Sequence, residues 1–315
     1  MNLLVTGGLG HIGSKLIRHY SSREDVELIR IFDNLSTQRY CSLFDLPRSK
    51  RYEFIEGDVR DPKGFAPAFE GIDTVIHLAA ITDAPATIDN ETETSNVNFE
   101  GTINALRAAE SAGVKKFLFP STTSVYGEAE GLVDELSPNL KPATPYAISK
   151  LEAEKTVSSF PFSTTSDLET VILRKGTIFG NSIGMRFHTA VNKFAYLAAL
   201  GLPLTLWEDA LDQKRPYLGL DDSIRAYEFL ELSGEPRETY NVLTGNYTVR
   251  DVIDTIGKFV PNVNIEMTKS PILNQKSYEV SDEKIRSLGF VPQDNLESQI
   301  GATIELFRGI RNDRR

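Results

Sequence analysis

The sequence predicts an α/β protein with a doubly wound parallel sheet and a smaller C-terminal α/β lobe. Short apolar segments alternate with segments of helical periodicity through residues 1–175, which is typical of βαβ units and a parallel sheet. The first apolar segment runs directly into a glycine-rich turn that opens a helix. After Arg174, glycines interrupt the pattern and the elements become shorter. We therefore expect a first domain over residues 1–175 and, over residues 176–315, mainly a substrate-binding lobe, from which segments can return to the first domain.

The expected elements follow one another in βα order. Ile12, Leu16 and Ile17 lie at helical spacing, so an amphipathic helix follows the first strand, and a longer helical pattern covers residues 92–112. The predicted strands of the first domain are Leu3–Val5, Glu27–Phe32, Tyr52–Ile55, Asp73–Leu78, Lys116–Phe119 and Thr170–Leu173. The predicted helices of the lobe are Val191–Leu200, Asp221–Leu232 with Asp221 or Asp222 as its N-cap, and Thr248–Phe259 with a threonine cap.

The composition is that of a globular protein and excludes several classes. Of the 315 residues, 40% are apolar and 25% are charged, which excludes disorder throughout. The net charge of −10 argues against a nucleic acid partner, because phosphate binding requires a basic surface. No apolar run is long enough to cross a membrane, and the first residues are typical of a strand rather than a signal peptide. The single cysteine, Cys41, and the spacing of the histidines predict neither a disulfide nor a metal site. We expect a cytoplasmic protein.

The segment Thr6–Gly13 has the spacing of a dinucleotide-binding turn. Gly7 permits the tight turn, Gly10 lets a pyrophosphate approach the backbone, and Gly13 lets the helix pack closely on the sheet. The helix that begins here offers free N–H groups and the positive end of its dipole to a phosphate. A glycine triplet alone is weak evidence, but its position between a strand and a helix predicts a Rossmann domain.

Asp33 ends the second strand, 20 residues after Gly13. This is the expected position of the acid that binds the adenosine ribose hydroxyls, and its charge repels a 2′-phosphate, so NAD is favoured over NADP. Asp58 and Val59 follow the third strand and can reach the adenine; the alternative is a solvent-exposed turn.

Tyr146 and Lys150 are four residues apart at the start of an expected helix, so their side chains face the same way. A free tyrosine has a pKa of about 10 and is a poor base at neutral pH. A neighbouring ammonium and an oxidised nicotinamide both favour the phenolate. Such a phenolate can take a proton from a substrate hydroxyl while a hydride leaves to the cofactor. Hydroxyls at residues 121–124, after the fifth strand, can hydrogen-bond the reacting oxygen or simply satisfy their own turn.

With these motifs, the chain resembles the extended short-chain dehydrogenases/reductases, in their sugar-nucleotide epimerase and dehydratase branch and nearest to the 4-epimerases. The resemblance runs through most of the chain. It rests on the glycine turn, Asp58-Val59, Asp73-x-Val75-x-His77-x-Ala79-Ala80, Asn98-x-x-Gly101-Thr102, Ser121-Thr122-x-x-Val125-Tyr126-Gly127, Glu135-x-x-Pro138, Tyr146-x-x-x-Lys150, Arg174 and the segment from Arg215 to Asp222.

The resemblance implies bound NAD, a nucleotide-sugar substrate and a homodimer. It implies that Tyr146 is the base, that Lys150 binds the nicotinamide ribose and lowers the tyrosine pKa, and that Thr122 is the catalytic hydroxyl. Arg215 is implied to pair with the nucleotide diphosphate; the alternative is a surface arginine. The cofactor-binding residues so implied are Gly7, Gly10, His11, Ile12, Gly13, Asp33, Asn34, Asp58, Val59, Ala79, Ala80, Asn98, Tyr146 and Lys150, and the substrate-binding residues are Thr123, Ser124, Thr177 and Arg215.

Positions at which the sequence differs from the family pattern disfavour some of the reactions that the family catalyses. Related 4,6-dehydratases carry an Asp-Glu pair directly after the catalytic threonine, and related decarboxylases carry a glutamate at the position of Ser124, whereas this chain has Thr123-Ser124. Without a carboxylic acid there, protonation of a departing C6 hydroxyl is hard, so dehydration and decarboxylation are both disfavoured. Family members often have a substrate-binding asparagine where this chain has Thr177, so the sugar is not fixed.

We therefore predict an NAD-dependent epimerase that acts on a nucleotide sugar at C4 through a transient keto-sugar. The main alternative is an NAD-dependent oxidoreductase that releases a keto nucleotide sugar, because it would use every residue named. A third hypothesis, a non-catalytic NAD-binding protein, is disfavoured by the presence of both Tyr146 and Lys150.

Overall fold

The computed structural model describes residues 1–310 except 128, 130, 161–162, 164–165, 208–209 and 270–276. Its centre is a seven-stranded sheet in the order β3-β2-β1-β4-β5-β7-β11, in which every pair is parallel. The chain leaves β1 toward β2 and β3 and then crosses back to β4, so the carboxyl ends of β1 and β4 flank the switch point. The strands are β1 (Asn2–Thr6), β2 (Leu28–Asp33), β3 (Arg51–Glu56), β4 (Thr74–His77), β5 (Lys116–Thr122), β7 (Glu169–Lys175) and β11 (Thr239–Val242).

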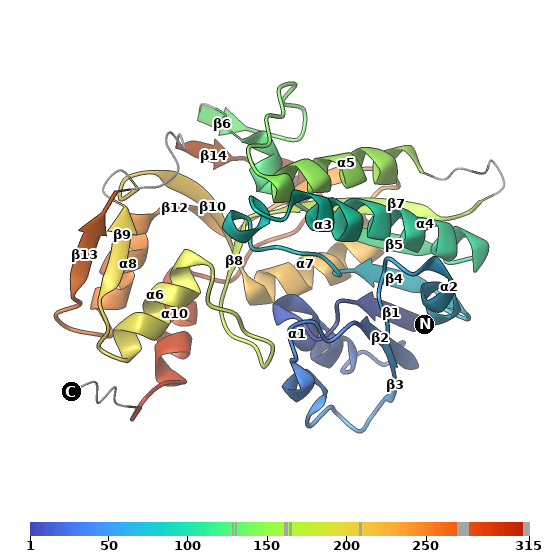
Figure 1. Cartoon of the computed structure of the whole chain (residues 1–315), viewed down its shortest axis with the longest axis horizontal. Coiled ribbons are helices and arrows are strands. Elements are labelled where there is room, and N and C mark those ends of the chain that lie inside the picture. Colours follow the sequence, from blue (N-terminus) through green and yellow to red (C-terminus); the bar gives the residue numbers. More distant parts are fainter. Residues whose placement is uncertain are drawn as a thin grey trace.

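Helices cover both faces of this sheet, and each face has its own apolar core (Figure 1). One face is covered by α1 (His11–Tyr20) and α7 (Leu220–Ser233). The opposite face is covered by α2 (Pro62–Phe65), α4 (Gly101–Ser111) and α5 (Pro145–Ser159). A π-helical turn over Asn96–Glu100 joins α3 (Glu91–Ser95) to α4. The predicted doubly wound α/β fold is confirmed.

The C-terminal lobe holds small sheets and a third apolar core, which includes Phe179, Phe194 and Ile300. One sheet has the order β12-β10-β8 and another pairs β13 with β9, while β14 and β6 pair beside the large sheet. The remaining elements are β6 (Gly131–Val133), β8 (Thr177–Phe179), α6 (Ala190–Ala199), β9 (Leu204–Trp207), β10 (Lys214–Gly219), β12 (Gly245–Thr248), α8 (Val249–Gly257), β13 (Ile265–Thr268), β14 (Tyr278–Val280), α9 (Glu283–Ser287) and α10 (Leu296–Glu305).

Two segments of the second half of the chain return to the large sheet: β11 pairs with β7, and α7 packs beside α1. All six predicted strands are present, and Thr248 caps α8 in a capping box. The predicted N-cap of α7 is wrong, because the helix begins one residue after Gly219. The fully buried Asp222 instead accepts hydrogen bonds from the Thr244 hydroxyl and the Asp294 N–H.

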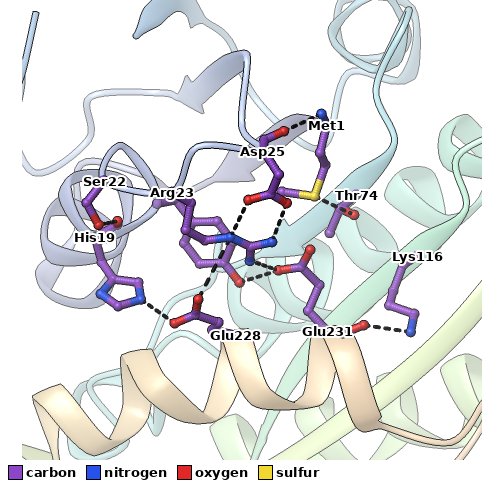
Figure 2. Close-up of polar contacts among 10 residues, drawn as sticks. Met1, His19, Ser22, Arg23, Asp25, Thr74, Lys116, Glu228 and Glu231 are labelled. Carbon is purple, nitrogen blue, oxygen red and sulfur yellow. Dashed lines mark hydrogen bonds and ion pairs between the residues drawn. The ribbon is translucent and has the colours of Figure 1, made fainter. Parts of the chain in front are cut away.

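A polar cluster joins α1 and α7 at the amino-end edge of the sheet, beside Met1 (Figure 2). The buried Glu231 carboxylate accepts from the Tyr20 hydroxyl at 2.8 Å and from the Arg23 guanidinium at 2.6 Å. Arg23 also pairs with Asp25, and Glu228 pairs with the ring of His19 at 2.6 Å. Because parallel-sheet ligands bind at the opposite, carboxyl edge, this cluster has a structural role.

Replacing Glu231 with alanine should lower the free energy of unfolding by about 3 kcal/mol, because it removes the buried partner of both Tyr20 and Arg23. The matched control is Glu228→Ala, whose side chain is 32% exposed; we expect a loss of about 1 kcal/mol or less there. Urea unfolding at neutral pH measures both. Equal losses in the two variants would contradict the structural role given to Glu231.

Candidate active site

The glycine turn joins β1 to α1 and faces the loop after β4. Gly7 has a φ of +63°, and its N–H donates to the carbonyl of Phe32 at 2.7 Å. A Cβ atom on Gly7 would lie 2.6 Å from the backbone nitrogen of Ala79. Both the positive φ and this close approach require glycine at position 7. The turn therefore sits directly at the switch point.

The N-terminus of α1 is open to an anion. Gly10 is the N-cap, no side chain caps the helix, and its first turn holds no acidic residue. Gly13 allows close packing, because a Cβ there would lie 2.5 Å from the backbone of Gly8. The ring of His11 is buried, its Nε2 atom has no hydrogen-bond partner among the described residues, and burial lowers its pKa to about 3. With Ile12 following it, this helix end suits a phosphate group.

Asp33 lies at the end of β2, at the edge of the glycine turn. Its carboxylate accepts from the N–H of Leu9 at 3.1 Å and from the N–H of Leu35 at 2.9 Å. These two bonds fix the carboxylate and leave lone pairs for the hydroxyls of a ribose. The neighbouring Asn34 is exposed, and its amide donates to the Asp58 carboxylate at 3.1 Å.

Asp58 and Val59 are engaged with the protein itself. The Asp58 carboxylate accepts three hydrogen bonds from Arg60 and one from Asn34. The hydrogen bonds from Arg60 hold the pKa of Asp58 well below its usual range. Val59 is buried against Gly101. A contact of Asp58 with adenine would require an exchange of partners, so it stays a prediction.

The side chain of Asn98 fixes the loop after β4 by hydrogen bonds. Ala79 and Ala80 are partly exposed on this loop. The Asn98 amide accepts from the N–H of Ile81 at 2.8 Å, and donates to the carbonyl of Ile81 at 2.9 Å and to the Ser149 hydroxyl at 3.1 Å. The sequence places Asn98 among the cofactor contacts; in the structure both N–H donors of its amide position this loop and α5, and the cofactor contact stays a prediction.

Tyr146, Thr122 and Ser124 form one hydroxyl cluster. Tyr146 is the second residue of α5, and the Thr122 hydroxyl at the end of β5 lies close enough to its phenol to oppose the rise in pKa that burial causes. Thr122 also accepts from the N–H of Ser124 at 3.1 Å and contacts its hydroxyl at 3.2 Å. The arrangement can pass a proton between a phenol and a substrate oxygen.

Lys150, the predicted partner of Tyr146, is buried beside β5. Burial raises the pKa of the Tyr146 phenol, and the groups that oppose this shift are Arg186 and Thr122. The Lys150 ammonium lies over the ring of Phe119, 4.6 Å from its centroid, and burial lowers its pKa to about 7. The role of Lys150 in lowering the pKa of Tyr146 stays a prediction.

Thr123, one of the predicted substrate contacts, points away from this cluster. Its hydroxyl donates to the carbonyl of Lys175 at 3.3 Å, and only 3% of the residue is exposed. It therefore ties β5 to β7. Ser124, by contrast, is partly exposed next to Thr122.

Thr177 and Arg215 lie on neighbouring strands, β8 and β10. Thr177 is exposed and stands opposite Tyr217 in the register, so the side chains of Thr177 and Arg215 leave the same face of the small sheet. The Arg215 guanidinium donates to Gln213 at 2.9 Å and lies over the ring of Tyr278. A diphosphate contact of Arg215 stays a prediction.

Two cations of the site were not predicted. Lys175 ends β7 beside Thr122 and is buried, with its ammonium 2.8 Å from the hydroxyl of Tyr227. Burial, Lys150 and Arg186 all lower its pKa. The sequence signal that could have identified Lys175 is its position as a charged residue at the end of an apolar strand. Arg186 lies in the irregular segment between β8 and α6, where no sequence signal marks it.

The fold and these groups define a class, the α/β proteins that bind a dinucleotide at the switch point of a parallel sheet. Comparison with known proteins narrows this class. The model of the NAD dependent epimerase/dehydratase family matches residues 3–242. A mouse dTDP-D-glucose 4,6-dehydratase is 31% identical over 97% of this chain and 88% of its own length.

A trifunctional UDP-glucose 4,6-dehydratase, epimerase and reductase of Arabidopsis thaliana is 29% identical over 97% of this chain, which spans only 47% of that relative. Among solved structures, the UDP-glucose 4-epimerase of Thermus thermophilus in complex with NAD superposes with a TM-score of 0.86 at 28% identity, covering 98% of this chain and 100% of that one. The chain belongs to the NAD dependent epimerase/dehydratase family.

Replacing Asp33 with asparagine should weaken NAD binding about tenfold and reduce the preference for NAD over NADP, because the ribose loses a charged acceptor and the 2′-phosphate a repelling charge. The asparagine side chain keeps one oxygen for the turn, whereas Asp33→Ala should show the same change with some loss of stability. Calorimetric titration of NAD and NADP measures the effect, with the exposed Asp89→Asn as control. Equal affinity of the wild type for NAD and NADP would refute the role of Asp33.

Proposed function

We propose that the chain is an NAD-dependent epimerase of a nucleotide sugar, acting at C4 through a transient keto-sugar. The observation that carries the proposal is the position of the Tyr146 phenol beside the Thr122 hydroxyl, followed by hydroxyl residues only at positions 123 and 124. This loop can accept and return a proton, but it offers no carboxylic acid to a leaving group.

The described residues fit NAD. The uncapped, unacidic N-terminus of α1 suits the pyrophosphate, and the held carboxylate of Asp33 suits the adenosine ribose. Lys150, one turn beyond Tyr146, is the candidate for the second ribose. When bound, NAD supplies the acceptor and donor of the hydride that the sugar carbon loses and regains.

The protein's own contribution is to move one proton. The Tyr146 phenolate takes the proton of the sugar C4 hydroxyl as the C4–H bond breaks, and the C4–O bond becomes a carbonyl. The keto-sugar then rotates within the site, so that the other face of C4 is presented. C4 regains the hydride on that face, and the phenol returns the proton to the same oxygen. Because burial raises the pKa of Tyr146, the phenolate needs nearby positive charge, and Arg186 contributes some of it.

The family comparison alone does not choose between epimerisation and dehydration, because relatives of both kinds resemble the chain. The residues favour epimerisation. A 4,6-elimination must protonate a departing C6 hydroxyl, and the hydroxyls of Thr123 and Ser124 are poor acids. Thr123 is also turned toward β7.

An oxidoreductase that releases the keto-sugar is the second candidate, since it needs the same base and cofactor. The two differ in cofactor balance: an epimerase regenerates NAD in each turnover, whereas an oxidoreductase accumulates NADH. A protein that only binds NAD is less favoured, because the neighbouring Tyr146 and Thr122 side chains would then have no catalytic function.

We further propose a cytoplasmic homodimer. The single cysteine is in keeping with a reducing compartment. Ile148 on α5 is 39% exposed, which leaves an apolar side chain available to a second copy. Light scattering of the purified chain measures the subunit number. None of the helices in the described part of the chain is long and apolar enough to cross a bilayer.

Incubation with a panel of UDP-, dTDP- and GDP-sugars should show C4 epimerisation of at least one sugar, without a net increase in the NADH absorbance at 340 nm. Tyr146→Phe should bind NAD but lose turnover by at least about 100-fold, because the base is gone. The control is Tyr196→Phe, which keeps the ring packed against Phe187 and Phe307 and removes only a hydroxyl. Stoichiometric NADH would favour the oxidoreductase, and full activity of Tyr146→Phe would sink the mechanism.

A further inference from the structure

The segment 181–186, between β8 and α6, lies against the glycine turn of the first domain, and Figure 1 shows this loop reaching toward α1. The Ser182 hydroxyl donates to the carbonyl of His11 at 2.8 Å and lies 2.9 Å from the His11 Nδ1 atom. The N–H of Gly184 donates to the Ser14 hydroxyl at 3.0 Å. A lobe segment is thus hydrogen-bonded to the first turn of α1.

Close backbone packing accompanies these bonds. A Cβ atom on Gly184 would lie 2.6 Å from the carbonyl oxygens of Leu9 and Gly10. Any larger residue would push the segment away from the turn. The segment therefore covers the residues at which a dinucleotide pyrophosphate binds in this fold.

At the end of the segment, Arg186 contacts the loop after β4. Its guanidinium donates to the hydroxyl of Thr82, while its buried Nε atom has no hydrogen-bond partner among the described residues. Besides burial, the charge of Arg186 lowers the pKa of His11 on one side, and it opposes the raised pKa of Tyr146 on the other. The guanidinium therefore lies near both the N-terminus of α1 and the candidate base.

Burial disfavours the charged form of Arg186, and the Asp83 carboxylate compensates this only in part. Burial lowers the pKa of Arg186 to about 10, and the groups that act on its charge are the Tyr146 phenol, Arg39 and the Asp83 carboxylate. His188 stands close by and is itself disfavoured as a cation by burial and by Arg186. A partly buried guanidinium with an unused donor gains most from a bidentate anion.

We propose that the segment 181–186 closes over the cofactor and that Arg186 binds its pyrophosphate from the side opposite α1. This rests on the proposed function, in that it requires NAD. The pyrophosphate would lie between the helix N-terminus and a guanidinium fork, beside the His11 Nε2 atom that has no partner among the described residues. The segment would thereby keep the cofactor bound through the two halves of an epimerisation.

A nucleotide sugar also carries a diphosphate, so the test must separate the two sources. Arg186→Gln should raise the dissociation constant for NAD at least about tenfold and leave the affinity for UDP unchanged. Arg186→Lys should recover part of the loss, because a point charge lacks the fork. The matched control, Lys193→Gln, removes one exposed charge from α6 and should leave NAD affinity unchanged.

The closure by segment 181–186 is tested by Ser182→Ala, which removes both contacts with His11. It should speed the release of NAD, measured by rapid dilution into ADP-ribose, and should leave the unfolding midpoint of the NAD-free protein within a few degrees of wild type. The NAD that copurifies with each variant, released by heat and quantified, gives a readout that needs no substrate. Unchanged NAD release in Ser182→Ala would overturn the closure.

The outcomes for Arg186 are distinct. If wild type binds NAD and Arg186→Gln binds it equally well, the assignment of Arg186 is overturned while the proposed function stands. If Arg186→Gln loses affinity for UDP instead, Arg186 serves the substrate diphosphate and the proposal is again wrong. If wild type binds no NAD at all, the proposed function fails together with this inference.

Discussion

The close approach of Gly7 to Ala79 is the constraint on which the site depends. With no side chain at position 7, the glycine turn after β1 and the loop after β4 meet backbone to backbone at the switch point of the sheet. The Thr6 hydroxyl adds a bond to the N–H of Ala79 at 3.3 Å. This contact sets the separation between the helix end that suits a phosphate and the loop whose Thr87 hydroxyl accepts from the N–H of Tyr146 at 3.3 Å. A Cβ at position 7 would move both.

Positive charge is the second feature that organises the site. Lys150 and Lys175 are buried on the two sides of the sheet edge, and Arg186 approaches from the lobe. Burial lowers the pKa of all three, which means that each gains by a nearby anion. The protein has a net charge of −10, so this local excess of cations is not a property of its composition. Arg186 favours a phenolate at Tyr146, and all three cations favour the binding of phosphorylated ligands.

Much of the fold was predictable because its signals are local. The glycine turn, the acid that ends β2 and the Tyr-Lys spacing each depend on residues that are neighbours in one element. What the sequence could not show concerns side-chain direction and distant contacts. The sequence could not show that Thr123 turns toward β7, or that Arg60 occupies the carboxylate of Asp58.

The same limit explains the residues that were missed. Arg186 comes to the site through an irregular segment whose path is fixed by Ser14 and His11, 170 residues away or more. The start of α7 depends likewise on Asp294, which binds the N–H of Asp222 across the lobe. A local cap rule placed that helix start at an aspartate, but tertiary contacts engage Asp222 elsewhere.

The central claim is that the hydride taken from the sugar returns to the same sugar without leaving the protein. It is tested most directly with a mixture of unlabelled nucleotide sugar and the same sugar deuterated at C4, followed by mass spectrometry of both epimers. We expect the label to stay in the molecules that carried it, at C4 of either epimer, with no transfer to unlabelled molecules. Deuterium recovered in free NADH, or spread among the unlabelled molecules, would contradict it.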